Sequence, residues 1–348
     1  MDTELWNKIL AFNLDAPMSE YNFSTRLAKE NYWTKNFTQQ AILEYKKFMY
    51  LAATSDFMVS PSEIVDVVWH QHLIFTQSYQ EFGVLIGKQV QHVPSTHNKE
   101  EFIKFKQAKE RTQKLYTENF KDQPTEIWEY SDMYQSLNLQ KAKLKIRTVI
   151  LLGIFAFVAL IIPAYYLLKP LYVQINNPYF ISGLIVLTFF IAIVLEYINH
   201  NKLKQLVNEF SSNSFVFNLH PLELVYSKKM QLANVVHGIV GELVDKKNIR
   251  VNKDNTIELV KKNTPTTLEE FQVNTTFASH KLTFYPVILK TLITKPIIAN
   301  TANAIDAFKK YVVKSKKFGS LFYLNFAVLA TLFMLVFVRF LTGIMRDK

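Results

Sequence analysis

The sequence predicts a mainly α-helical membrane protein in which an all-helical N-terminal domain and a smaller basic α+β domain are attached to three transmembrane helices. Three observations predict this fold class: three long apolar segments, helical spacing of apolar residues in the N-terminal part, and a helix–helix–hairpin pattern between the second and third apolar segments. The expected boundaries are residues 1–140 for the helical domain, 148–168, 178–198 and 320–343 for the spans, 201–300 for the basic domain, and 304–318 for an amphipathic helix beside the membrane.

The N-terminal domain carries clear helix signals. Thr38 to Ala53 has apolar residues on a 3.6-residue period together with strong helix-forming residues. A second helix is expected to begin with Ser60 as the N-cap, Pro61 at the first helical position and Glu63 completing a capping box. We expect this helix to run to about Leu85 and to end at Gly87.

Histidine is the most informative residue type for chemistry. Four of the eight histidines fall in one short stretch, as His70, His72, His92 and His97. Asp66 and His70 are four positions apart and share a helix face, and a following loop can bring His92 back onto that face. Neutral imidazole and carboxylate are ligands for zinc and other transition metals. Asp66, His70 and His92 are therefore the candidate metal ligands, and no other cofactor is predicted.

The same residues also allow a purely structural interpretation. His72 is two positions from His70, about 200° around the helix, so it should point away from the ion towards Thr76 and Tyr79. His72 would be the general acid or base if the protein is an enzyme. The alternative is that His70 and Asp66 form a buried polar pair and that His72 is hydrogen-bonded in the core. The chain has no cysteine and no HExxH motif, so thiolate chemistry and cysteine-based zinc sites are excluded.

The run EYKKFMYLAATSDFMVSPSEIVDVVWHQHLIFTQSYQEF resembles the core motif of the glycine-rich domain-containing protein family of plants and bacteria. The V-D-x-x-W-H-x-H-L pattern of that family is matched by Val65, Asp66, Trp69, His70, His72 and Leu73. The resemblance spans roughly residues 5–130 and continues through His92-Val93-Pro94 and through Thr112, Tyr116, Phe120, Pro124, Ile127 and Trp128. Bacterial relatives often have two adjacent histidines in the loop, and the first of them is Gln91 here. The glycine-rich tail is absent, and the resemblance implies no particular reaction.

Each of the three apolar segments is long enough to cross a bilayer core of about 30 Å. Flanking lysines set the expected orientation through the positive-inside rule. Cations precede the first span and the third span and follow the second, whereas the link between the first two spans has only Lys169. We therefore expect a multi-pass protein of the cell (inner) membrane, with residues 1–147 and 199–319 in the cytoplasm and the C-terminus outside. Glu196 and Arg339 lie near span ends, where their charges can reach water.

The segment between the second and third spans is strongly basic. Residues 201–319 carry 18 Lys/Arg against 9 Asp/Glu, whereas residues 1–147 carry 18 of each. Helices over 220–226 and 230–246, followed by a β-hairpin around Asp254-Asn255, give a winged-helix-like order. The motif Leu219, Pro221, Glu223 and Tyr226 resembles a segment found between spans in a family of poorly characterised bacterial membrane proteins.

Three functions fit these observations. The first is a non-enzymatic membrane protein that presents its cytoplasmic domains to a protein partner and rests on an anionic lipid surface. The second is a membrane-tethered metal-dependent enzyme that uses the Asp66, His70, His72 and His92 cluster. The third is a DNA-binding regulator, which the lack of base-reading side chains in 230–246 disfavours. With 8 glycines and no phosphate loop, a nucleotide cofactor is not expected.

Overall fold

The computed structural model describes residues 1–93, 99–254, 256–260, 265–279 and 282–345. It is mainly helical, with three helices apolar enough to cross a membrane, as the sequence predicts, and it contains one small three-stranded sheet. The chain divides into unit 1, made of residues 1–136 and 212–308, and unit 2, made of residues 137–211 and 309–348.

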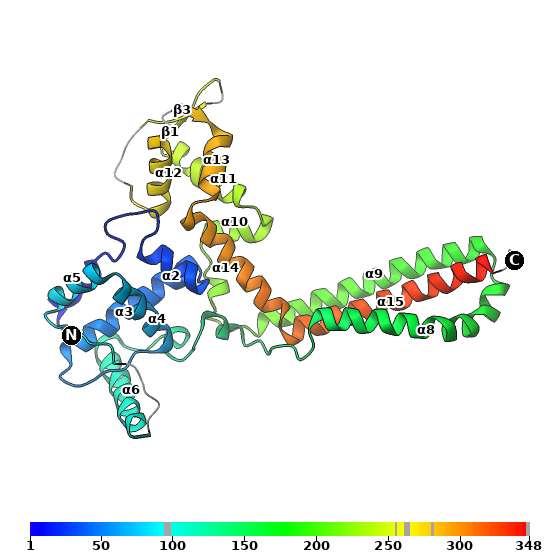
Figure 1. Ribbon diagram of the computed structural model, residues 1–348, viewed down its shortest axis with the longest axis horizontal. Helices are drawn as coiled ribbons and strands as arrows, with labels where there is room; N and C mark the ends of the chain where they lie inside the picture. Colours follow the sequence, from blue (N-terminus) through cyan, green and yellow to red (C-terminus); the bar gives the residue numbers. More distant parts are fainter. Residues whose placement is uncertain (94–98, 255, 261–264, 280–281, 346–348) are drawn as a thin grey trace. The chain divides into compact units, whose positions relative to one another are not determined.

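Helix α3 (Lys35–Thr54) is the central element of the N-terminal part of unit 1 (Figure 1). Its apolar side chains, such as Phe48 and Leu51, are buried, and so are the polar side chains of Glu44 and Lys46. The other elements of this part are α1 (Thr3–Ala11), α2 (Phe23–Asn31), α4 (Glu63–Ile74), α5 (Thr76–Ile86), α6 (Lys99–Phe120), α7 (Thr125–Trp128) and the 3₁₀ helix η1 (Met133–Leu137).

Glu44 connects three helices around this centre. One carboxylate oxygen accepts hydrogen bonds from the Tyr116 hydroxyl of α6 and the Trp128 indole of α7, both at 2.7 Å. The other oxygen binds the Lys47 ammonium at 2.8 Å. A buried carboxylate is tolerated only when it is saturated in this way. Tyr116 and Trp128 of the family-like pattern therefore have a structural role in this chain.

The basic part of unit 1 is built around a separate apolar core. Val235 and Ile239 of α11 are buried against Ile257, Phe277 and other apolar residues. Its elements are η2 (Phe215–Phe217), α10 (Pro221–Lys229), α11 (Leu232–Asp245), β1 (Ile249–Val251), β2 (Thr256–Leu259), α12 (Leu268–Ser279), β3 (Leu282–Phe284), α13 (Tyr285–Ile293) and α14 (Pro296–Val313).

The expected β-hairpin is confirmed by the antiparallel pairing of β1 and β2, with Arg250 opposite Glu258. A third strand, β3, pairs antiparallel with β2 and gives the sheet order β1-β2-β3. Strand β3 was not predicted, because Leu282–Phe284 is too short to show an alternating pattern. Asn255, in the predicted turn, lies outside the described residues.

Glu223 joins the two parts of unit 1 by capping two helices. One of its oxygens accepts the backbone N–H of His220 at 2.9 Å, which forms the capping box of α10. The other accepts the backbone N–H of Lys35, the first residue of α3, at 2.8 Å, where the side chain of the N-cap Thr34 does not cap the helix. The Lys35 ammonium in turn binds Glu269 of α12 at 2.5 Å. Burial raises the pKa of Glu223, and the two N–H donors oppose that rise.

Unit 2 contains the three apolar helices, α8 (Ile146–Gln174), α9 (Asn177–Asn208) and α15 (Lys316–Ile344). Helix α15 packs against both of the others (Figure 1). Gly153 permits close packing of α8 on α15, because a Cβ at this position would overlap the ring of Phe326. Asn199 of α9 and Asn325 of α15 exchange side-chain amide bonds of 3.3 and 3.0 Å. Each helix meets the length and composition of a membrane span.

The two charged side chains of the predicted spans have different environments. Arg339 donates hydrogen bonds to the Ile175 carbonyl at 2.8 Å and to the Asn177 side chain at 2.7 Å, and it also binds the Tyr172 carbonyl. These acceptors lie where α8 ends and α9 begins, so Arg339 satisfies carbonyls that the end of a helix leaves unpaired. Glu196 is exposed on α9.

The predicted single helix over residues 304–318 is wrong. Helix α14 ends at Val313, and α15 begins at Lys316 with Ser315 as its N-cap. The chain between them pairs with the segment before α8, through a bond from the Ala142 N–H to the Lys314 carbonyl at 2.9 Å. Ile305, on the apolar face of the expected helix, is 4% exposed in the core of the basic part. Helical spacing alone does not distinguish a face covered by protein from one covered by lipid.

Replacing Glu223 by Ala should destabilise unit 1 by about 2–4 kcal/mol, because it removes the caps of two helices at once. The measurement is urea unfolding of the detergent-solubilised full chain, followed by tryptophan fluorescence. Glu242→Ala is the matched control, since Glu242 is exposed and its ion pair with Lys246 lies within one helical turn. Equal midpoints for the two variants would contradict the double-cap assignment.

Candidate metal centre

Helix α4 directs its two histidines in opposite directions. Its N-cap is Ser62, whose hydroxyl accepts the Val65 N–H at 3.2 Å, so the prediction of Ser60 as the cap is wrong by two residues. The Ser60 N–H is instead bound to the Thr112 hydroxyl at 2.8 Å. The predicted continuous helix also breaks at Phe75 between α4 and α5. The His70 side chain is 55% exposed, whereas His72 is 0% exposed.

His72 is a buried structural residue. Its Nδ1 shares a hydrogen bond with the Tyr45 hydroxyl at 2.7 Å, and its Nε2 shares one with the Ser78 hydroxyl at 3.1 Å. The ring also lies edge-on to Tyr79, with centroids 5.2 Å apart, as the helical spacing predicts. Burial lowers the pKa of His72 to about 4, so the ring is neutral at pH 7. Neither ring nitrogen is free for a substrate, and the role of acid or base for His72 finds no support in these contacts.

The loop after α5 brings His92 towards α4. Gly87 ends α5 in the left-handed region, with a φ of 68°. The Trp69 indole then donates to the Tyr79 hydroxyl at 3.0 Å, and that hydroxyl donates to the carbonyl of Val90. The Trp69 ring also packs edge-on against His92, with centroids 4.7 Å apart. Trp69 and Tyr79 therefore position the residues that precede His92.

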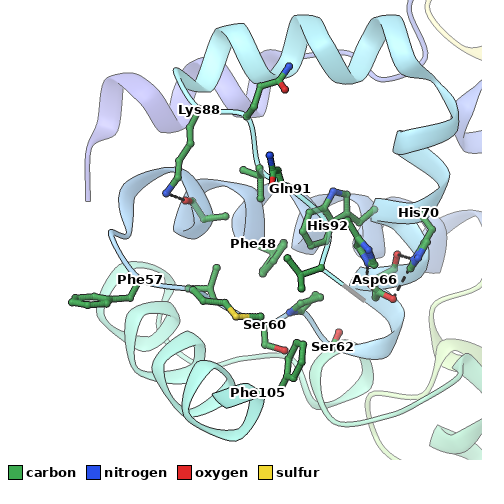
Figure 2. A pocket seen from close by; sticks show the side chains of 18 of the residues that line it. Phe48, Phe57, Ser60, Ser62, Asp66, His70, Lys88, Gln91, His92 and Phe105 are labelled. Atoms are coloured by element: carbon green, nitrogen blue, oxygen red, sulfur yellow. Dashed lines mark hydrogen bonds and ion pairs between the residues drawn. The ribbon is translucent and has the colours of Figure 1, made fainter. Parts of the chain in front are cut away.

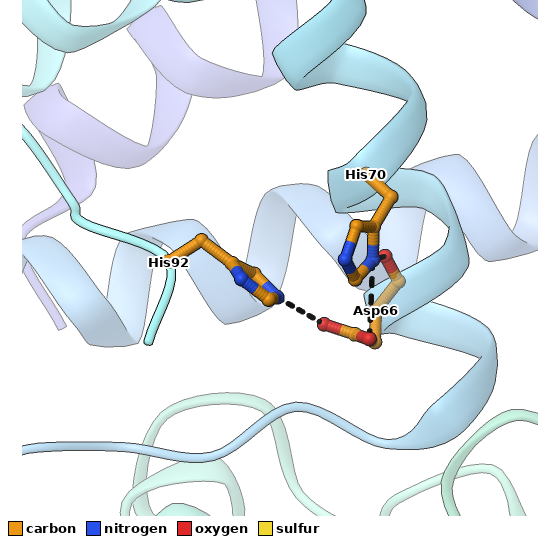
Figure 3. Close-up of side chains that lie close together, drawn as sticks. All are labelled: Asp66, His70 and His92. Carbon is orange, nitrogen blue, oxygen red and sulfur yellow. Dashed lines mark hydrogen bonds and ion pairs between the residues drawn. The ribbon is translucent and has the colours of Figure 1, made fainter. Parts of the chain in front are cut away.

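Asp66 lies between the two imidazoles of the candidate site (Figure 3). One carboxylate oxygen is 2.9 Å from Nε2 of His92, and the other is 3.1 Å from Nδ1 of His70. Nδ1 of His70 is also 2.9 Å from the backbone carbonyl of Asp66. The two imidazole rings have their centroids 4.3 Å apart. The structure thus brings together the three residues that the sequence singled out.

These donors fit a transition-metal ion. One ligand atom from each of Asp66, His70 and His92 lies within 4.8 Å of the other two. Ligands about 2.0–2.1 Å from a tetrahedral zinc ion lie about 3.4 Å apart, so small side-chain rotations would suffice. A proton on Nδ1 of His70, donated to the Asp66 carbonyl, leaves the Nε2 lone pair available. Two imidazoles favour zinc or a related ion over magnesium or calcium. Three protein ligands leave a coordination position open.

The three residues line a cleft of about 630 Å³ (Figure 2). Segments 56–63 and 88–93 form much of its lining. Glu63, at the end of the first segment, is exposed. It shares a helix face with Asp66 and His70, which follow it by three and seven positions. That spacing could have identified Glu63 from the sequence. Phe57 and Phe105 have no such signal, because neither residue belongs to α4 and the helical spacing of α4 does not include them.

Two loop residues of the sequence analysis, Pro94 and His97, lie outside the described residues. In comparisons with protein-family models, curated proteins and solved structures, nothing matches this chain. The resemblances to the glycine-rich domain-containing protein family and to bacterial multi-span membrane proteins stay predictions.

The two histidines of the W-H-x-H motif should respond differently to substitution. His72→Ala should lower the free energy of unfolding by about 2–4 kcal/mol, because it leaves a cavity and the unpaired hydroxyls of Tyr45 and Ser78. His70→Ala should change it by less than about 1 kcal/mol, since the side chain is largely exposed. Urea unfolding of the metal-free full chain measures both. A larger loss for His70→Ala would show that the assignment is reversed.

Proposed function

We propose that this protein is a membrane-anchored metal-binding protein whose helical domain presents an open transition-metal site to the cytoplasm. The observation that carries the proposal is the convergence of Asp66, His70 and His92 beside a cleft. Zinc is the ion that these donors suit best, and it would supply a Lewis acid next to the cleft. The role of this chain's residues is to hold the ion with three ligands, to orient His70 through the Asp66 carbonyl, and to shape the cleft.

The second candidate function is the presentation of unit 1 to a protein partner at an anionic lipid surface. It is supported by exposed cations in unit 2, close to the ends of the apolar helices. The bridge between Lys141 and Ser315 sets the exposed Lys141 beside the exposed Lys314 and Lys316. Such a cluster is attracted to anionic headgroups by about 1 kcal/mol per cation. This role is compatible with a metal site.

DNA binding by the basic part receives less support. The exposed face of α11 carries the acidic residues Glu242 and Asp245, which repel phosphates. The Lys246 ammonium is paired with Glu242 at 2.8 Å and with Glu270 at 3.0 Å. We therefore propose that the basic part of unit 1 contacts a protein partner or the membrane surface.

Metal binding is tested with the full chain purified in detergent without a polyhistidine tag. We expect one zinc or cobalt ion per chain by elemental analysis. Asp66→Ala, His70→Ala and His92→Ala should each weaken binding by at least about tenfold, because each removes one of three ligands. His200→Ala is the matched control, since His200 is exposed on α9 outside the candidate site. A metal content that these three variants leave unchanged would rule out the site.

The orientation is tested by cysteine labelling, which the absence of natural cysteines makes simple. The four exposed positions chosen are Gln113, Asn176, Lys229 and Met345. A membrane-impermeant maleimide added to intact cells should label Asn176→Cys and Met345→Cys only, because the positive-inside rule places these two outside. Gln113→Cys and Lys229→Cys should react only after permeabilisation. Labelling of these two in intact cells would invert the proposed topology.

A further inference from the structure

The cleft beside the candidate metal ligands has largely apolar walls. In Figure 2, Phe57 lies on the side of the cleft opposite His70 and Asp66, and Phe105 lies along its lower edge. The other apolar residues that line it are Phe48, Ala52, Met58, Val59, Pro61, Trp69, Val90 and Val93. The volume of about 630 Å³ falls within the ~300–1,000 Å³ of small-molecule sites.

Arg111 of α6 fixes the part of the cleft wall that contains Phe57 and Met58. The Arg111 guanidinium donates to the Met58 carbonyl at 2.6 Å and lies 5.1 Å from the centroid of the Phe57 ring. Phe57 is nevertheless 68% exposed, so most of its ring contacts no part of the described chain. An aromatic ring fixed at the edge of a cleft and left open to solvent offers an apolar contact to a ligand.

Charge excludes one large class of ligands. Lys88 is the one lysine or arginine among the described residues that line the cleft. Two of its three N–H donors are already bound to the carbonyls of Ala52 and Ser55, both at 2.8 Å, so one donor is left for a ligand. Phosphate and carboxylate recognition usually needs Arg or Lys with free donors. The described lining therefore does not suit an anionic substrate.

The carboxylates that line the cleft also disfavour an anionic substrate. Asp56, Glu63 and Asp66 contribute three negative charges, and Lys88 contributes one positive charge. A divalent cation bound at the three ligands would bring the sum to zero. An uncharged group next to the ion is favoured in such an environment, whereas an added anion gains nothing from the walls.

We infer that the cleft takes a ligand with a metal-coordinating head group, such as a carbonyl derivative, joined to an uncharged apolar aryl or acyl group that packs on Phe57 and Phe105. This inference rests on the proposed function, because the head group needs the bound ion. It assigns the site to neutral acyl or aryl compounds such as amides and esters, and not to phosphoesters or nucleotides.

The test uses the full chain in detergent, loaded with Co²⁺, and three hydroxamate probes followed by the visible absorption of the cobalt. Benzohydroxamate should bind at least about tenfold more tightly than acetohydroxamate, because its ring is buried against the cleft walls. Phosphonoacetohydroxamate, with an anionic tail, should bind no more tightly than acetohydroxamate. Binding of the three probes with equal affinity, or preference for the anionic one, would overturn the inference.

Two variants show whether the preference arises in the cleft. Phe57→Ala and Phe105→Ala should each reduce the ratio of benzohydroxamate to acetohydroxamate affinity by at least about threefold, without changing the affinity for Co²⁺. Phe57 is exposed, so its removal should not affect folding. Phe102→Ala is the matched control, because Phe102 is an exposed residue of the same helix as Phe105 and does not line the cleft. An unchanged ratio in both variants would overturn the assignment of Phe57 and Phe105 as the residues that contact the apolar group.

The outcomes separate this inference from the proposed function. Failure of Asp66, His70 and His92 to hold Co²⁺ would remove the metal site itself. Co²⁺ bound by these three residues, with no preference for the aryl probe, would leave the metal site in place and remove only the assignment of the ligand class.

Discussion

A polar group taken out of water must be hydrogen-bonded, and this requirement organises unit 1. Glu44 is saturated by Tyr116, Trp128 and Lys47, and thereby joins α3 to α6 and α7. Glu223 meets the same requirement by capping α3 and α10 together. Because Tyr116, Trp128 and Lys35 are distant in sequence from the carboxylates that they bind, each network positions helices that apolar packing alone would leave less well defined.

The same requirement separates the two histidines of α4. His72 is enclosed by Tyr45 and Ser78 and has no nitrogen left for chemistry. His70, on the opposite side of the helix, remains accessible and lies beside Asp66 and His92. One motif thus supplies a residue that stabilises the domain and a residue that can bind an ion.

Most of the motif residues described here contribute to packing. Trp69 illustrates this, since its indole acts through Tyr79 on the loop that carries His92, and its ring contacts the His92 ring. In the basic part, Glu223 and Tyr226 of the second motif likewise contact other elements of unit 1, Lys35 and Asp306 respectively. The two sequence motifs therefore give more information about how the helices pack than about the function of the protein.

The three apolar helices, the β1–β2 hairpin and the shared face of Asp66 and His70 could all be predicted from the amino-acid sequence. Each of these depends on residues close together in the chain, where spacing and hydrophobicity act directly. The folded chain was needed to show that His92 lies against Asp66, that Ser62 and not Ser60 caps α4, that β3 joins the sheet, and that Ile305 is covered by protein. These features depend on contacts between residues distant in sequence, and local periodicity carries no information about such partners.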